Sequence, residues 1–432
     1  MALQEPKNNL EVVSGKLVIM SCFAGRRSNI EVLLKYADVL KERGLIHEFH
    51  LWNFARNDDD DLWLQEEFGE KMVYAMRSYD YISIPGHDTL PFTLDVRAAR
   101  DVHILVSAGG NELYEIVLGG WSNRRSIVRT QRQGQPVLIV NQGIPTNFTQ
   151  ISVIIEDGCL CVHVGHLLNF LKVQLDPDVV NAHTQGKTPL KVMCAGWDGL
   201  VVWRLPHVKT PKNVKRSYVK LMDVADRSIW SEYYKHYTEE KYPNTLLIKA
   251  DDDICFIDIN AFEHFLGTLD REPECLMAFP SIINNGVCAN YQQDAGLIPY
   301  SVGTFPYDPL CGYLWKNGDV CQRLHEYFTN NFENILKQSA CLGIRRHPIG
   351  HRISINFFII ASKDFSVLQQ IGKDDEHELS VRMTRCNKRP ICVEQGFVVS
   401  HLAFYKQRQT GLDEKHVLKL YGELAETYLK TI

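Results

Sequence analysis

The sequence predicts an α/β protein that is interrupted by an all-β sandwich. Three observations support this fold class. The chain opens in strand–helix–strand order, a long middle section then alternates in short apolar runs, and helical periodicity returns towards the end. A chain of 432 residues is long enough for two or three domains. We therefore predict a first α/β part at residues 1–78, an inserted sandwich at 79–206 and a second α/β part at 207–432.

The first part begins with "KLVIMSCFA" (Lys16–Ala24), a short apolar run typical of a buried strand. Ser28 is the expected N-cap of a helix, "NIEVLLKYADVLKERG", that ends at Gly44. "IHEFHLWNF" follows as a second strand, and this order is how parallel sheets begin. Because ligands of such sheets lie beyond the carboxyl ends of the strands, Phe23–Arg27 and Asn53–Asn57 are expected at a site.

The middle section contains runs such as "FTLDVRA", "DVHILVSA" and "SVIIEDGCLCVHV", separated by Gly, Asn, Asp or Pro. Many short strands at this spacing, with no convincing amphipathic helix, favour an antiparallel sandwich. Within it, Trp121 and Arg124 of "GGWSNRRSIVR" are candidate glycan contacts, or else an ordinary turn and strand.

The last part returns to helical periodicity. "SIWSEYYKHYTEEKY", "INAFEHFLGTL", "GDVCQRLHEYFTNNFENILKQ" and "EKHVLKLYGELAETYLK" are predicted helices, and "NTLLIKADDD" is predicted to contain a buried strand.

Composition excludes several classes of function. The net charge of −5 gives no sign of a nucleic-acid or membrane-surface footprint. No window is apolar for long enough to cross a bilayer, and the polar N-terminus lacks the apolar centre of a signal peptide. The 12 cysteines form no CxxC pair, which favours reduced, mostly buried thiols. We expect a cytoplasmic protein without a transmembrane segment or a nucleic-acid partner.

Three consecutive carboxylates end the apolar run "LLIKADDD". In an extended chain Asp251 and Asp253 point the same way, and two carboxylates on one side suit Mg²⁺ or Mn²⁺. The alternative is a solvated acidic turn, but the apolar flanks favour the metal site. Asp58–Asp61 lies instead in a polar stretch that leads into a helix, so there we expect an acidic helix N-terminus.

Later residues complete a possible site. Asp375 and Glu376 of "IGKDDEHELSV" are either a general base or charges at a helix N-terminus. His401 follows the apolar strand of "FVVSHLAFYKQR" and is either structural or a third metal ligand. Four basic residues are candidate contacts for diphosphate oxygens, or else surface charge: Arg26, Arg27, Lys406 and Arg408.

Together these motifs resemble a metal-dependent glycosyltransferase of the GT-A fold. In that family an acidic DXD motif holds a divalent cation that bridges the diphosphate of a nucleotide-sugar. The resemblance implies Mn²⁺ or Mg²⁺ as cofactor, a UDP- or GDP-sugar as donor, and Asp251 and Asp253 as the DXD. It also implies His401 as a C-terminal metal ligand and Asp375 or Glu376 as the base of an inverting enzyme.

The same resemblance places a nucleotide pocket at the ends of the first strands, with Phe23, Ala24, Arg27, Asn53 and Asp251. Acceptor contacts are expected in the amide-rich "SIINNGVCANYQQ" and "GHRISINFF", at Asn284, Asn285 and Arg352. The acceptor would be a glycan, a glycoprotein or another hydroxyl compound, and a bacterial or viral cytosolic enzyme fits better than one of the Golgi lumen. The rival interpretation is a non-catalytic protein that binds carbohydrate or nucleotide-sugar through the sandwich.

The insert has a resemblance of its own. "VHILVSAGGNELYEIVLGGWSNRRSIVR" resembles the domain named after farnesoic acid O-methyltransferase. That resemblance implies a β-sandwich for binding or interaction. The insert lacks the Gly-rich strand-to-helix turn that a methyl donor requires, so we do not expect methyl transfer.

Overall fold

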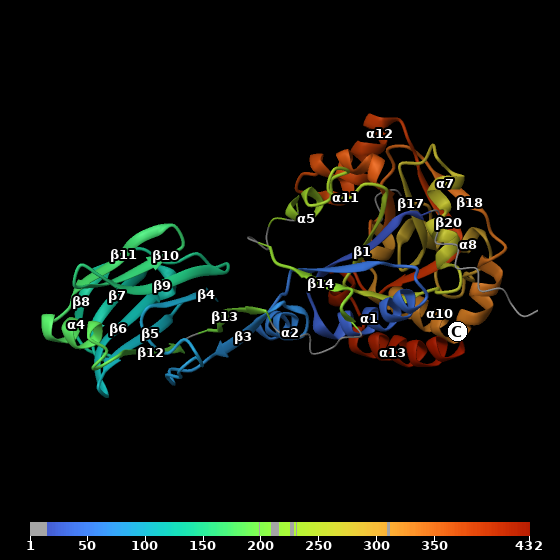
Figure 1. The fold of residues 1–432 in the computed structure, drawn as a ribbon. Helices are drawn as coiled ribbons and strands as arrows, with labels where there is room; N and C mark the ends of the chain where they lie inside the picture. Colours follow the sequence, from blue (N-terminus) through green and yellow to red (C-terminus); the bar gives the residue numbers. More distant parts are fainter. Residues whose placement is uncertain (1–14, 198, 209–215, 225–228, 230, 309–311) are drawn as a thin grey trace, which may run out of the picture. The chain divides into compact units, whose positions relative to one another are not determined.

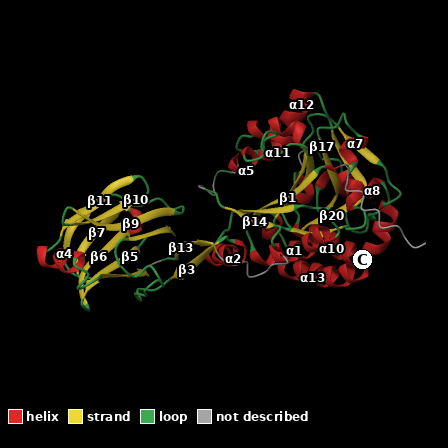
Figure 2. Ribbon diagram, viewed as in Figure 1, coloured by secondary structure: helices red, strands yellow, loops and turns green. Residues whose placement is uncertain are grey.

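The computed structural model describes residues 15–197, 199–208, 216–224, 229, 231–308 and 312–432 (Figures 1 and 2). The chain divides into two compact units, Met1–Arg56 with Asn213–Ile432, and Asn57–Lys212. The smaller unit thus begins well before the predicted boundary at residue 79. The reason is that β3 (Lys71–Met76) pairs with β13 (Val201–Val208) and so belongs to the sandwich. The predicted N-terminal features at residues 1–14 lie outside the described residues.

The larger unit is built on one mixed sheet, in the order β14-β2-β1-β15-β19-β17-β20-β16, with β18 beside β20. The first four strands of this order are parallel, and β19 runs antiparallel to both of its neighbours. The strands are β1 Leu17–Ala24, β2 Glu48–Asn53, β14 Val219–Met222, β15 Thr245–Asp251, β16 Ile254–Ile257, β17 Met277–Ile283, β18 Ile344–His347, β19 Phe357–Ala361 and β20 Ile391–His401.

Three long helices gather along one face of this sheet: α1 (Arg27–Glu42), α10 (Gly318–Ser339) and α13 (Glu414–Thr431) (Figure 1). Their amphipathic patterns were predicted correctly. The N-cap of α1 is Arg26 rather than Ser28, because the backbone is extended at Arg26 and already helical at the following residue.

The remaining helical segments are short. The segment predicted as one helix, "SIWSEYYKHYTEEKY", contains only α5 (Ser231–Lys235) within its described residues. The helix stops before Tyr237, whose buried hydroxyl contacts Ser21 and Trp52 of the sheet. The others are α6 Phe262–Leu266, α7 Thr268–Arg271, α8 Gly286–Asp294, α9 Gly312–Trp315, η3 Ser362–Gln370, α11 Asp375–His377, η4 Glu378–Met383, α12 Thr384–Asn387 and η5 Gln407–Gln409.

The strand order reverses between β1 and β15. From β1 the chain continues to β2 on one side, and it later returns to place β15 on the other side of β1. The two strands are parallel, and Phe23 pairs with Asp251 at their carboxyl ends. In open α/β sheets, ligands bind beyond the carboxyl ends of the strands at such a reversal. The topology therefore directs attention to the Asp251 edge of the sheet.

The smaller unit consists of two antiparallel sheets, in the orders β11-β10-β9-β4-β13-β3 and β12-β5-β6-β7-β8. A large cluster of buried hydrophobic residues includes members of both sheets, as the predicted sandwich requires. The additional strands are β4 Phe92–Ala98, β5 Val102–Ala108, β6 Asn111–Gly119, β7 Arg125–Thr130, β8 Pro136–Val140, β9 Thr149–Glu156, β10 Cys159–Val164, β11 Leu167–Gln174 and β12 Leu190–Gly196.

The helices of this unit are α2 (Asp58–Phe68), α3 (Gly120–Asn123) and α4 (Pro177–Thr184). The four aspartates Asp58–Asp61 fill the first turn of α2, and Asn57 caps it, which confirms the predicted acidic helix N-terminus. The sequence did not predict α4. Among the described residues of either unit, no helix is long and apolar enough to span a membrane.

Candidate metal centre

The acidic triplet lies in a tight connection between two strands of the sheet. Asp251 is the last residue of β15, and β16 begins at Ile254. β16 runs antiparallel to β20, and Ile254 pairs with His401, the last residue of β20. The sheet register itself therefore brings the late histidine beside the aspartates, as the sequence predicted for residues at strand ends.

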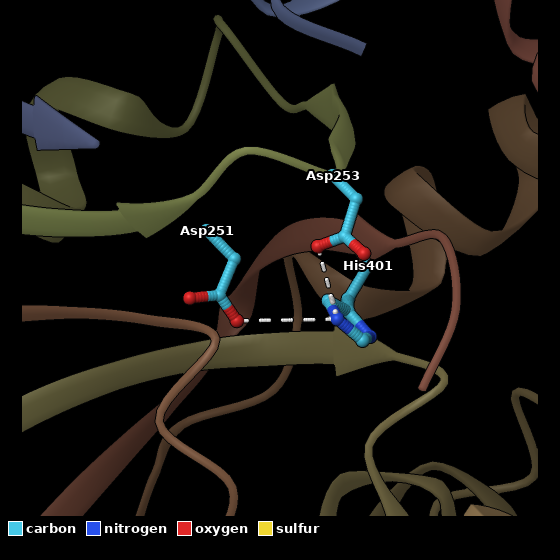
Figure 3. Close-up of side chains that lie close together, drawn as sticks. All are labelled: Asp251, Asp253 and His401. Atoms are coloured by element: carbon cyan, nitrogen blue, oxygen red, sulfur yellow. Dashed lines mark ion pairs between the residues drawn. The ribbon is translucent and has the colours of Figure 1, made fainter. Parts of the chain in front are cut away.

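Three side chains converge at this point (Figure 3). The His401 Nε2 lies 3.1 Å from the Asp253 Oδ1 and 3.9 Å from the Asp251 Oδ2. One ligand atom from each residue lies within 4.8 Å of the other two. Asp253 and His401 are buried, whereas Asp251 is partly exposed. Two carboxylates and an imidazole at this spacing fit Mn²⁺, which accepts both oxygen and imidazole ligands.

Side-chain cations also compensate the acidic triplet. The Arg26 Nη2 lies 2.9 Å from the Asp252 Oδ1 and 2.8 Å from the Asp253 Oδ2, and Arg408 also reaches Asp253, at 3.2 Å. Lys249 pairs with Asp251. The sequence offered solvent or a metal ion as the partner of these buried charges, and the structure adds basic side chains to that choice.

Ionisation of Asp253 follows from its surroundings. Burial by itself would raise the pKa of this carboxyl, but His401, Arg26 and Arg408 lower it below its ordinary value. Asp252 differs, since burial outweighs its hydrogen bond from Arg26 and raises its pKa. Asp253 is therefore held as a carboxylate, which is the form that binds a cation.

His401 is the least satisfied member of the group. Its Nδ1 is buried and has no hydrogen-bond partner among the described residues, and the ring of Phe404 lies 4.5 Å away. A buried nitrogen without a partner costs free energy. The Nε2 faces both aspartates and is the nitrogen that would bind a metal, so the buried Nδ1 is a separate feature of this ring.

A cavity of about 410 Å³ opens at these residues, which is within the size range of small-molecule sites. It brings together six predicted site residues: Phe23, Asp251, Asp253, His401, Asp375 and Glu376. Gly25, Phe54 and Arg56 also line it, and they belong to the two segments expected at a site from the strand ends. The cavity also contains residues that the sequence analysis did not select: Lys249, Asp252, Ile355, Asn356, Ala403, Phe404 and Tyr405. Arg408, one of the predicted basic residues, lines it too.

The second pair of carboxylates lies at the start of α11. The Tyr234 hydroxyl donates a hydrogen bond of 2.7 Å to the Asp375 Oδ2. Glu376 pairs with Arg352, whose guanidinium also contacts Asp374. Asp374 caps the helix. Asp374 therefore serves the helix end, while Asp375 and Glu376 line the cavity, and their role as a general base stays a prediction.

Three residues predicted at the nucleotide pocket do not line the cavity. Ala24 is fully buried in β1. Asn53 is also buried, with its Oδ1 near the backbone N–H of Ala55. Arg27 is half-exposed and pairs with Glu31 on its own helix, because Arg27 is the first residue of α1 and follows the helix surface. It is the preceding Arg26 that reaches the aspartates.

The predicted acceptor residues have structural contacts. The Asn284 amide binds the Gln407 Oε1 and the carbonyls of His401 and Leu402, and so fixes the turn after β20. Asn285 caps α8. Of the three, Arg352 approaches the cavity, through its pair with Glu376. The two asparagines are fully buried, so acceptor contacts through them are not supported by the geometry.

Comparison with known proteins gives limited information. A model of the family described as farnesoic acid O-methyltransferase matches residues 75–184, about a quarter of the chain and all within the smaller unit. No curated protein matches. A crystal structure assigned as a beta-glucanase from Mycobacterium abscessus is similar at 12% identity with a TM-score of 0.20, covering 32% of this chain and 76% of that one. A likeness at this level indicates neither fold nor activity.

Proposed function

We propose that the larger unit is a metal-dependent glycosyltransferase that moves a sugar from a UDP- or GDP-sugar to a hydroxyl acceptor. The observation that carries this proposal is the convergence of Asp251, Asp253 and His401 at the strand-order reversal, with two further carboxylates in the same cavity. The farnesoic acid O-methyltransferase match concerns the other unit and does not bear on this site.

The donor set assigns roles to individual residues. Asp251, Asp253 and His401 would hold Mn²⁺ or Mg²⁺, which supplies Lewis-acid stabilisation of the leaving diphosphate. Arg408 and Arg56 line the same cavity and offer planar guanidinium donors that match phosphate oxygens. Phe23 and Tyr405 provide aromatic surface for a base or a sugar ring. These groups together suit a ligand with a diphosphate and ring systems.

Asp375 is the better placed of the two predicted bases. A base must accept a proton from the acceptor hydroxyl as that oxygen attacks the sugar carbon. The Arg352 guanidinium already pairs with Glu376. Asp375 instead accepts a hydrogen bond from the neutral hydroxyl of Tyr234. Direct attack assisted by Asp375 would invert the configuration at the sugar carbon.

The proposal is tested by following released nucleoside diphosphate with a panel of UDP- and GDP-sugars, with and without Mn²⁺. One donor should be hydrolysed slowly by the wild type with metal, and Asp253→Ala should abolish this turnover. Absence of hydrolysis for every donor, together with absence of any metal-dependent thermal shift, would overturn the proposal. A metal-dependent thermal shift without turnover would instead support the non-catalytic alternative.

A further inference from the structure

The sandwich unit has its own cavity, which has a volume of about 550 Å³. Its walls include two tryptophans, Trp121 and Trp197, and a set of polar side chains: Arg100, Asp101, Arg129 and Gln133. We call this the sandwich cavity. All of its residues belong to one compact unit, so it is distinct from the metal centre.

Both tryptophans are unusually exposed. Trp121 is 46% and Trp197 is 53% exposed, whereas Trp203 of the same unit is fully buried. The ring of Trp197 packs edge-on against Tyr79, with the centroids 4.6 Å apart, and the Arg129 guanidinium lies 5.8 Å from the centroid of Trp121. Large aromatic surfaces that are both exposed and fixed by neighbours are typical of binding sites.

The backbone at Trp121 is strained. Trp121, Ser122 and Asn123 have φ values of 54°, 60° and 60°, in the left-handed region that non-glycine residues avoid. Each such residue costs on the order of 1 kcal/mol or more, and persists only where its surroundings enforce it. Here the Asn123 amide exchanges two hydrogen bonds with the backbone of Ile144, at 2.8 and 2.9 Å. The strained turn holds Trp121 at the cavity wall.

A buried carboxylate organises the neighbouring wall. Glu115 is fully buried and accepts hydrogen bonds from Tyr79, from Tyr81 at 2.8 Å, from His103 at 2.9 Å and from the backbone N–H of Gln133 at 2.7 Å. Tyr79, His103 and Gln133 all line the cavity. Glu115 therefore fixes the side chains of Tyr79 and His103 and the backbone at Gln133 before any ligand arrives.

Charges in the sandwich cavity are closely balanced. The Arg129 Nη1 lies 3.5 Å from the Glu115 Oε2, and the Arg100 Nε lies 3.9 Å from the Asp101 Oδ2. Asp101 lines the cavity together with both guanidiniums, and the buried Glu115 compensates Arg129 from behind the wall, so a strongly anionic ligand would meet no excess of positive charge. A purely apolar ligand would bury these polar groups without partners, which costs free energy. The cavity thus suits a neutral molecule with both apolar faces and many hydroxyl groups.

We propose that the sandwich cavity binds a neutral saccharide, with the C–H faces of its rings against Trp121 and Trp197. Sugar hydroxyls both donate and accept hydrogen bonds, so they match the mixed set of Arg100, Asp101 and Gln133. Arg124, the second glycan contact expected from the sequence, has a different role: its Nε bonds the Trp121 carbonyl. This inference does not rest on the proposed transferase activity, and either can fail alone.

The test uses the full chain and a panel of neutral tetrasaccharides of glucose, galactose, mannose or N-acetylglucosamine. Binding is measured by calorimetry and by tryptophan fluorescence. At least one tetrasaccharide should bind and change the fluorescence. Trp121→Ala and Trp197→Ala should each weaken its binding at least about tenfold, since each removes a stacking surface. Because both side chains are exposed, the variants should fold and melt as the wild type does.

Matched controls separate this site from others. Leu168 is also on the surface of the sandwich unit, 74% exposed, and lies outside the cavity. Leu168→Ala should therefore bind the tetrasaccharide as the wild type does. Asp253→Ala, in the other unit, should also bind normally whether or not the transferase proposal holds. Two results would overturn the inference: no tetrasaccharide of the panel binds, or binding is unchanged in both tryptophan variants.

Discussion

The imidazole of His401 and the carboxylate of Asp253 lie 3.1 Å apart, at the ends of structural elements that are distant in the sequence. Their meeting follows from the pairing of Ile254 with His401 between β16 and β20. Because the sheet register fixes the backbone on both sides, the two side chains are preorganised for a shared ligand. The predictions below begin from this arrangement.

Asp375 and Glu376 should differ in their effect on sugar transfer. Asp375→Asn keeps an amide oxygen that can still accept the Tyr234 hydrogen bond, so the fold should be preserved. The variant loses the proton acceptor, and transfer to an acceptor should fall roughly 100-fold or more. The measurement is the rate of product formation at saturating donor and acceptor.

Glu376→Gln is the matched control for Asp375→Asn. Arg352 also pairs with Asp374 at 3.1 Å, so the guanidinium remains held in this variant. We expect a smaller loss of transfer than for Asp375→Asn. If both single variants retain nearly full turnover, neither carboxylate is the base and the inverting mechanism is wrong.

Tyr405 should contribute to donor affinity rather than to stability. Its side chain lines the metal-centre cavity and is 63% exposed. Stacking of an aromatic ring on a nucleotide base is worth about 1–3 kcal/mol. Tyr405→Ala should therefore weaken donor binding at least about fivefold without a change in melting temperature. Tyr300→Ala, 70% exposed and outside the cavity, is the control, and equal effects of the two variants would contradict the assignment.

Glu115 should make the sandwich unit sensitive to acid. Burial alone would raise its pKa, but hydrogen bonds from His103, Tyr79, Gln133 and Tyr81 lower it from 4.5 to about 2. A carboxyl whose folded pKa is lowered stabilises the folded state above the unfolded pKa, and this stabilisation is lost as the pH falls through the folded value. The shift corresponds to about 3 kcal/mol, lost between about pH 4.5 and pH 2.

The measurement is hydrogen exchange of the β5 and β6 amides in the wild type and in Glu115→Gln, compared at the same pH. Exchange should be much faster in the variant at pH 6, and the difference should shrink below about pH 4.5. Glu112→Gln, on the same strand but partly exposed, should show little difference at either pH. A wild-type advantage that stays constant down to pH 3 would refute the role given to Glu115.

Periodicity was enough to predict much of the fold. Apolar runs identified β1 and β15, and amphipathic spacing identified α1, α10 and α13. The prediction of one long helix was wrong for the tyrosine-rich segment, because the buried contacts of Tyr237 with Ser21 and Trp52 are tertiary and leave no trace in the local pattern. The boundary of the sandwich was also misplaced, since nothing local shows that β3 pairs with β13, more than a hundred residues later in the chain.

The site was predictable where strands end. Phe23, Asp251, Asp253 and His401 all lie at carboxyl ends of strands or in the turn that follows, which a sequence shows directly. Lys249 gave no signal, because a single lysine within an apolar run does not indicate its partner. Which of Arg26 and Arg27 reaches the aspartates depends on the exact residue at which α1 begins. Helix ends are the part of a helix that is hardest to place from sequence.

The central claim is that Asp251, Asp253 and His401 hold a divalent cation. The most direct measurement is Mn²⁺ binding to the purified protein, read from the loss of the free-ion signal in electron paramagnetic resonance. The wild type should bind one Mn²⁺ at this site, and Asp253→Asn should lose it. Asp258→Asn changes another buried aspartate of the same unit, one bonded to Tyr428 at 3.0 Å, and should bind Mn²⁺ normally. Equal binding by the wild type and Asp253→Asn, or no binding by either, would contradict the account.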